Sequence, residues 1–115
     1  MILVIGARAS GKLDYVKSLG YSDSDIANGV LDGRKVVYNL QNAVFRDPEN
    51  APNLLDELLE KEVVVCDEVG SGVIPLERNE RRAREATGRL CIQLAKRASR
   101  VVRLVCGLAT VIKEQ

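Results

Sequence analysis

A short glycine-containing segment near the N-terminus has the residue types that bind phosphate. Between Gly6 and Lys12 the chain reads G-x-x-x-x-G-K, directly after the apolar run 2–5. Glycines let backbone N–H groups turn toward phosphate oxygens, a following helix adds partial positive charge, and the lysine neutralises the β and γ oxygens. The sequence therefore predicts a nucleotide site. Its predicted residues are Gly6, Ala7, Arg8, Ala9, Ser10, Gly11, Lys12 and Leu13.

The eighth position of this motif departs from the usual pattern. Leu13 stands where a Ser or Thr normally gives its hydroxyl to Mg²⁺. A magnesium ion bound here would rely on nucleotide oxygens, water and carboxylates from elsewhere in the chain. Because the bare motif is short, a glycine turn followed by a surface lysine is the alternative interpretation.

Two carboxylates follow another apolar run. The segment 63–66 is continuously apolar, and Asp67 and Glu68 come directly after it. In an open parallel sheet the carboxyl ends of the strands face the ligand crevice, so these acids are expected near the glycine loop. We predict Asp67 as a Mg²⁺ ligand, and Lys12 and Glu68 as catalytic residues, with Glu68 orienting or deprotonating an attacking hydroxyl. The alternative is that both acids simply end a strand in solvent.

Basic side chains gather at the start of a predicted long helix. The group consists of Arg78, Arg81, Arg82 and Arg84. Glutamates four positions before arginines, as in Glu80 and Arg84, match much of this charge on the helix surface. The pattern favours a solvated helix face. Arg78 is the best placed of the group as a phosphate ligand, since it is nearest the loop after Glu68.

Hydrophobic periodicity outlines the elements that must position these residues. Apolar runs predict buried strands over 2–5, 63–66 and 101–106, with further strands over 35–40 and 111–113. Helical spacing predicts helices over 10–19 and 52–62, and a long helix that ends near 98. The segment 20–33, rich in Ser, Asp, Asn and Gly, predicts a long connection. Strands that alternate with helices indicate an α/β fold with a parallel sheet.

Composition limits the class of function. The chain has 115 residues, 46% hydrophobic and 29% charged, which predicts a single globular domain over 1–115. A net charge of +1 and an aromatic content of 3% argue against nucleic-acid binding. Acids dominate 14–68 and bases dominate 76–103, which permits a homo-oligomer as well as two solvated faces. Three cysteines, with no signal peptide or membrane span, predict a cytoplasmic protein that binds no membrane.

One segment is more specific than the glycine loop. From Glu68 the chain reads E-V-G-S-G-V-I-P, ending at Pro75. It resembles the N-E-V-G-x-G-[IV]-[IV]-P segment of the adenosylcobinamide kinase/adenosylcobinamide-phosphate guanylyltransferase family, with Asp67 in place of Asn. The resemblance continues through the arginine-rich helix, the segment 93–95 and the C-terminal segment 101–107. Together with the glycine loop it covers about two-thirds of the chain.

The resemblance implies a P-loop (RecA-like) three-layer sandwich with a mainly parallel sheet. It also implies a kinase that uses ATP or GTP, with Mg²⁺, to phosphorylate the aminopropanol hydroxyl of a corrinoid in cobalamin biosynthesis. Guanylyl transfer in the family passes through a histidine intermediate, and this chain has no His, so we expect none by that route. The alternatives are an inactive nucleotide-binding module that acts through a protein partner, and a degenerate fold whose loop binds only phosphate or sulfate.

Overall fold

Three apolar runs form the middle of a six-stranded sheet. In the computed structural model, which describes residues 1–68 and 77–115, the strands are β1 (Ile2–Gly6), β2 (Ile26–Asn28), β3 (Val36–Tyr38), β4 (Val63–Asp67), β5 (Arg100–Val105) and β6 (Leu108–Glu114). Their order across the sheet is β2-β3-β4-β1-β5-β6. Neighbouring strands are parallel, except for the antiparallel pair β5 and β6. The predicted α/β class with a mainly parallel sheet is therefore confirmed.

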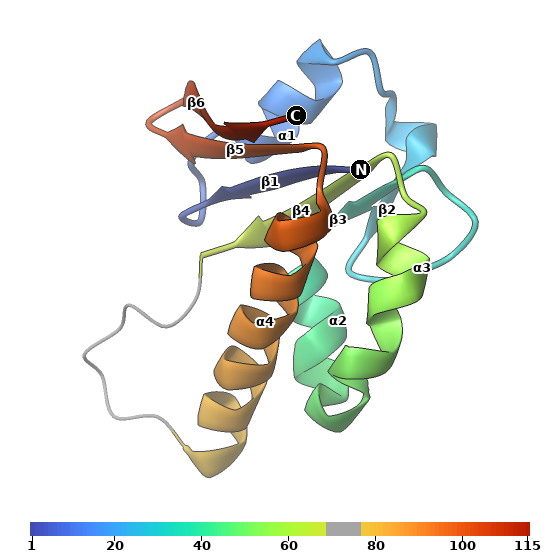
Figure 1. The fold of residues 1–115 in the computed structure, drawn as a ribbon, viewed down its shortest axis with the longest axis vertical. Helices are drawn as coiled ribbons and strands as arrows, with labels where there is room; N and C mark the ends of the chain where they lie inside the picture. The colour runs from blue at the N-terminus through green and yellow to red at the C-terminus, as the bar shows by residue number, and fades with distance from the viewer. Residues whose placement is uncertain (69–76) are drawn as a thin grey trace.

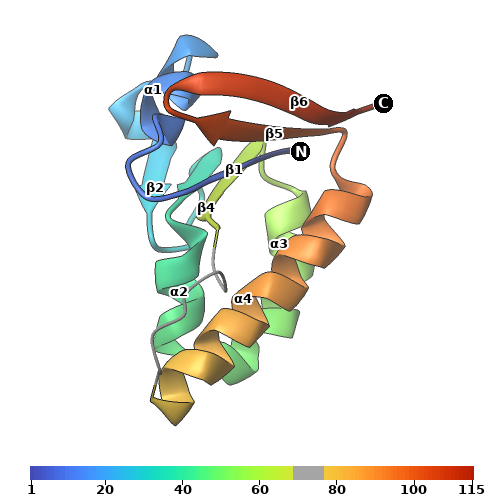
Figure 2. The ribbon, with the colours of Figure 1, turned by 90° about the vertical axis from the view of Figure 1, so that its left-hand side faces the viewer.

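Helices cover both faces of the sheet (Figures 1 and 2). The helix α1 (Lys12–Ser18) lies on one face, while α2 (Leu40–Arg46), α3 (Leu55–Leu59) and α4 (Arg78–Arg97) lie on the other. Two 3₁₀ helices, η1 (Asp23–Asp25) and η2 (Pro48–Leu54), complete the connections. The result is three layers, an arrangement consistent with a P-loop fold.

Side chains of the central strands alternate between two cores. On the face that α1 covers, here called the α1 face, Val4 of β1 packs in one cluster with Val16 of the helix. On the opposite face, here called the α4 face, Leu3 and Val64 pack in a second cluster with Leu94 of α4. Since successive strand residues point to opposite faces, a continuous apolar run fills both cores at once.

Several elements differ from the sequence predictions. The strand β2 lies inside the segment predicted as an irregular connection, and the helix α2 was not predicted at all. The helix predicted over 52–62 begins as η2 and becomes α-helical only at Leu55, since Pro52 has no N–H for the α-helical ladder. The predicted edge strand over 111–113 is longer and includes Leu108.

The glycine and proline loop predicted at Gly70, Gly72 and Pro75 lies outside the described residues, as does most of the segment that carries the family resemblance. Within the described ranges, none of the helices combines the length and apolar character needed to cross a membrane.

Candidate functional site

The carboxyl ends of β1 and β4 bring the predicted site residues together. Gly6, the last residue of β1, lies in register with Asp67, the last residue of β4. The backbone N–H of Glu68 donates a hydrogen bond to the carbonyl of Gly6 at 2.8 Å. The glycine loop and both acids therefore lie on one edge of the sheet, where the topology of parallel strands was expected to put them.

The backbone of the glycine loop turns through two left-handed residues, Ala9 with φ 60° and Gly11 with φ 97°. The Ser10 N–H donates to the carbonyl of Ala7 at 3.2 Å. The N–H groups of the loop residues Arg8, Ala9 and Gly11 have no acceptor among residues 1–68 and 77–115. Unpaired loop amides beside a helix start are the donors that an anion requires.

Lys12 is buried inside this loop. Its side chain is only 3% exposed, and its Nζ forms an ion pair with Oδ1 of Asp67 at 2.9 Å. The same Nζ donates to the carbonyl of Ala7 at 2.6 Å and lies 3.4 Å from Oγ of Ser10. A protonated amine has three donors, and these three oxygens satisfy them. The ammonium group is thus buried beneath the loop, and a phosphate bound there would compete with these three oxygens for its hydrogen bonds.

Asp67 and Glu68 point to opposite faces of the sheet. Asp67 forms its ion pair with Lys12 on the α1 face, whereas Glu68 forms a bidentate ion pair with Arg103 of β5. Nε of Arg103 donates to Oε1 of Glu68 at 2.6 Å, and a terminal guanidinium nitrogen donates to Oε2 at 3.1 Å. Arg103 is in register with Ile5, which packs on the α4-face core. The structure therefore does not bring the two carboxylates to one metal ion. The hydrogen bond to Glu68 raises the pKa of the Arg103 guanidinium.

A cavity of about 250 Å³ opens above the glycine loop. Besides loop residues it is lined by Leu13 and Asp14 of α1 and by Tyr38 at the end of β3. Burial raises the pKa of the Tyr38 hydroxyl, and the negative charges of Asp67 and Asp14 raise it further. The Tyr38 phenol is therefore a neutral hydrogen-bonding group at the mouth of the cavity.

Three other residues that sequence patterns did not single out support the site. The side-chain oxygen of Gln41, at the start of α2, accepts the Asp67 N–H at 3.0 Å. Gly107, in the turn between β5 and β6, donates its N–H to the carbonyl of Ser10 at 2.9 Å. The third is Arg103. It is the one charged residue within the predicted apolar strand 101–106, and this feature of the sequence could have identified it as a functional residue. Nothing local marks Gln41 or Gly107, because their contacts span many residues of chain.

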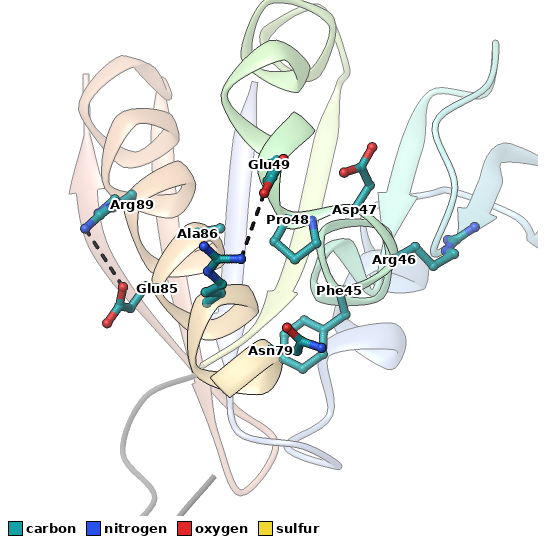
Figure 3. A pocket seen from close by; sticks show the side chains of 10 residues that line it. Phe45, Arg46, Asp47, Pro48, Glu49, Asn79, Glu85, Ala86 and Arg89 are labelled. Atoms are coloured by element: carbon teal, nitrogen blue, oxygen red, sulfur yellow. Dashed lines mark ion pairs between the residues drawn. The ribbon is translucent and has the colours of Figure 1, made fainter. Parts of the chain in front are cut away.

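A larger cavity, of about 590 Å³, lies between α2, η2 and the first half of α4 (Figure 3). Its charged side chains pair loosely: Arg82 and Glu49 lie 3.9 Å apart, and Arg89 and Glu85 lie 4.0 Å apart. None of the described residues that line it belongs to the glycine loop. We place the functional site at the smaller cavity, since the buried Lys12 and the free loop amides are there.

The arginine group of α4 is distant from the glycine loop. In both views the first turn of α4, which begins at Arg78, is the end of the helix farthest from the sheet (Figures 1 and 2). Of the predicted helix-surface ion pairs, only Glu85 with Arg89 is within 4.0 Å in the part of the chain that the structure describes. That part also contains no group of three or more acidic or cysteine side chains arranged to hold a metal ion.

Comparison with known proteins identifies the family. Residues 26–112 match the family model described as cobinamide kinase/cobinamide phosphate guanyltransferase, which is 87 of the 115 residues. The chain belongs to this family. Membership implies a role in cobalamin biosynthesis as a cobinamide kinase or guanyltransferase. No curated protein matches the chain.

The matched range contains part of the site only. Asp67, Glu68 and Arg103 lie inside it, as do Tyr38 and Gln41, whereas the glycine loop precedes it. The geometry of the loop is thus an observation independent of the family match.

Leu13 tests whether the missing hydroxyl of the motif matters. Its side chain is half-buried and packs on the α1-face core, so Leu13→Ser should lower the free energy of unfolding by about 2 kcal/mol. If the new hydroxyl completes a metal site, the same variant should bind Mg²⁺-nucleotide more tightly than wild type relative to nucleotide alone.

The matched control is Leu13→Ala, which removes the same packing without adding a hydroxyl. Denaturation curves of both variants give the packing loss, and Mg²⁺ titrations of nucleotide affinity isolate the hydroxyl. Identical metal dependence in the serine and alanine variants would show that the hydroxyl plays no part at this position.

Proposed function

We propose that the chain has a P-loop (RecA-like) fold, binds ATP or GTP at the glycine loop, and transfers the γ-phosphoryl group to a side-chain hydroxyl of a corrinoid, cobinamide. The observation that carries this proposal is the buried Lys12 ammonium, held within the loop and 2.9 Å from Asp67 at the carboxyl edge of the sheet. A buried cation surrounded by unpaired amides has the charge and the donors that a triphosphate needs.

In this proposal the residues of the α1 face bind the nucleotide. The free N–H groups of Arg8, Ala9 and Gly11 donate to phosphate oxygens, and Lys12 shares its charge between Asp67 and the β and γ oxygens. Asp67 is partly exposed and fits a Mg²⁺ site of one carboxylate, nucleotide oxygens and water. A bound Mg²⁺ would supply neutralisation of phosphate charge.

The residues of the α4 face serve the acceptor. The acceptor oxygen forms a bond to the γ-phosphorus, the bond from that phosphorus to the bridging oxygen breaks, and the nucleoside diphosphate leaves. Glu68 orients the hydroxyl and takes its proton. Arg103 fixes the Glu68 carboxylate through two hydrogen bonds, so it acts as a positioning residue. In this arrangement the donor and acceptor approach one strand end from opposite faces of the sheet.

A catalytically inactive nucleotide-binding module is the second candidate. It is favoured by Leu13, which removes a metal ligand from the motif, and by the ion pair that engages both oxygens of Glu68. In that case the chain would hold a nucleotide and act through a protein partner, without turnover.

The experiment that separates the two uses purified protein with ATP or GTP, Mg²⁺ and cobinamide. We expect a product heavier than cobinamide by one phosphoryl group, together with an equal amount of nucleoside diphosphate. Glu68→Gln should keep nucleotide affinity and lose transfer, because the amide cannot take the hydroxyl proton. Nucleotide binding without product in the wild-type protein would establish the inactive module, and absence of nucleotide binding would refute both.

The family's guanylyl transfer leads to a separate prediction. A phosphoramidate on imidazole requires a histidine, and the chain has none, so we expect no covalent GMP adduct after incubation with GTP and Mg²⁺. Mass spectrometry of the intact denatured protein checks this. An added mass of one GMP would contradict the prediction and would direct attention to a lysine or carboxylate as the acceptor.

A further inference from the structure

Three side-chain amides form a chain of hydrogen bonds along the carboxyl edge of the sheet. The Nδ2 group of Asn39 donates to Oδ1 of Asn28 at 2.9 Å, and Nε2 of Gln41 donates to Oδ1 of Asn39 at 3.1 Å. Oε1 of Gln41 in turn accepts the backbone N–H of Asp67 at 3.0 Å. The chain therefore leads from β2, the strand at one edge of the sheet, to the end of β4, where the candidate site lies.

Asp67 needs this acceptor because the neighbouring strand β3 ends before it. At the start of β4 the N–H of Val63 points toward β3 and donates to the carbonyl of Lys35 at 3.5 Å. Every second N–H of a strand points to the same side, so the N–H of Asp67 also points toward β3. There the left-handed residue Asn39, with φ 56°, has already turned the chain into α2. The side-chain oxygen of Gln41 thus takes the place of a strand carbonyl.

The direction of the amide chain is fixed at its inner end. A backbone N–H can only donate, so Gln41 must present its oxygen to Asp67 and its amino group to Asn39. For the same reason Asn39 presents its oxygen to Gln41 and its amino group to Asn28. Gln41 and Asn39 are half-buried and Asn28 is exposed. Each outer amide therefore orients the next one inward, and Gln41 is the member that contacts the site.

The backbone at the end of β4 is held from both sides. The N–H of Asp67 donates to Gln41 on one side, and the N–H of Glu68 donates to the carbonyl of Gly6 on the other, at 2.8 Å. The two carboxylates extend to opposite faces of the sheet, one to the lysine of the glycine loop and the other to the arginine of β5. A tilt of this strand end would therefore displace both carboxylates at once, in opposite directions.

We propose that Gln41 is a positioning residue for phosphoryl transfer, and that Asn39 and Asn28 orient its amide. The inference rests on the proposed function, in which the nucleotide binds on the α1 face and the acceptor hydroxyl meets Glu68 on the α4 face. Transfer requires both groups in the reactive arrangement at the same time, whereas binding of the nucleotide alone depends on Lys12 and the loop amides. Loss of the Gln41 oxygen should therefore slow transfer and leave nucleotide binding close to normal.

The test compares Gln41→Met with Gln41→Glu. Methionine has a similar length but offers the Asp67 N–H only a weakly accepting sulfur, whereas glutamate keeps an oxygen at the same distance along the side chain. In the assay with ATP or GTP, Mg²⁺ and cobinamide, we expect Gln41→Met to lower kcat about tenfold and to change the KM for nucleotide by less than about twofold. Gln41→Glu should recover most of the lost kcat.

The matched control is Gln93→Met, which makes the same change at an exposed position of α4 and should alter neither kcat nor KM. Circular dichroism reports whether each variant is folded at the assay temperature. Asn39→Gly is the second test variant, in case Gln41→Met does not fold. Glycine adopts the left-handed φ of this position without strain and removes the amide that orients Gln41, so kcat should fall in the same direction by a smaller factor.

The split between kcat and KM distinguishes positioning from a structural role. A purely structural role would lower the free energy of unfolding of Gln41→Met and leave kcat of the folded variant unchanged, and this result would overturn the proposal. A Gln41→Glu protein as slow as Gln41→Met would contradict it as well, because the accepting oxygen would then not be the group that matters. A wild-type protein that makes no product would refute the proposed function and the role of Gln41 with it. A wild-type protein that transfers phosphate no faster than Gln41→Met would refute the role of Gln41 alone.

Discussion

Replacing Lys12 with alanine is expected to weaken nucleoside triphosphate binding at least tenfold. The Lys12 ammonium group is buried within the loop, where its Nζ lies 2.6 Å from the Ala7 carbonyl oxygen and 2.9 Å from Oδ1 of Asp67. A charge-assisted contact with phosphate contributes about 1.5–3 kcal/mol, and loss of that amount corresponds to roughly tenfold or more in affinity. Titration calorimetry with ATP and GTP measures the change directly.

The same substitution should also lower stability, which the sequence alone did not suggest. An exposed loop lysine would contribute little to folding, but Lys12 is 3% exposed and pairs with Asp67. Removing it leaves a partly buried carboxylate without its partner, at a cost of about 1–2 kcal/mol. Denaturant unfolding should therefore show a less stable Lys12→Ala protein. Adding Asp67→Asn to it should restore part of the loss, because the unpaired charge is then gone.

Lys17→Ala is the matched control for both measurements. Lys17 belongs to the same helix, but it is exposed and pairs with Asp23 at the surface. Its loss should change neither nucleotide affinity nor stability by a measurable amount, since exposed ion pairs contribute little. If Lys12→Ala binds nucleotide as tightly as the wild type and Lys17→Ala, the loop is a glycine turn with a structural lysine and not a phosphate site.

The sequence predicted the central part of the fold because its signals there are local. Continuous apolar runs marked β1, β4 and β5, since buried parallel strands need apolar side chains on both faces. The elements it missed are short. The strand β2 has three residues and the helix α2 has seven, too few for periodicity to stand out from the surrounding polar residues. The strand β6 was predicted only as a short strand over 111–113, although it is the longest strand in the described chain.

The candidate site was predictable in its members and less so in its geometry. The position of Asp67 and Glu68 at a strand end followed from the sequence. Their separation to opposite faces also follows from the period of a strand, in which adjacent residues alternate. The partner of Glu68 could not be predicted, because Arg103 reaches it only through the register of β4, β1 and β5.

Gly6→Ala should distort the carboxyl end of β1, where the glycine loop begins. A β-carbon on this residue would lie 2.5 Å from the Ser10 hydroxyl and 2.8 Å from the carbonyl oxygen of Leu104. The Ser10 side chain can rotate away, but the Leu104 carbonyl is part of the β5 backbone and moves only with its strand. We expect the free energy of unfolding to fall by about 2–3 kcal/mol, in the range of an overpacked core.

Nucleotide affinity should fall with it, since the end of β1 cannot shift alone. The Gly6 carbonyl accepts the Glu68 N–H at 2.8 Å, so displacement of one moves the other and the loop that follows. Gly88→Ala is the control: the β-carbon meets no atom within 4 Å, and an alanine inside α4 should raise stability by about 0.5–1 kcal/mol. Urea unfolding and nucleotide titration of the two variants test the argument. A Gly6→Ala protein with wild-type stability and nucleotide affinity would contradict the argument. It would mean that the end of β1 moves away from β5 without loss of stability, and that the close approach of the two strands is not needed for nucleotide binding.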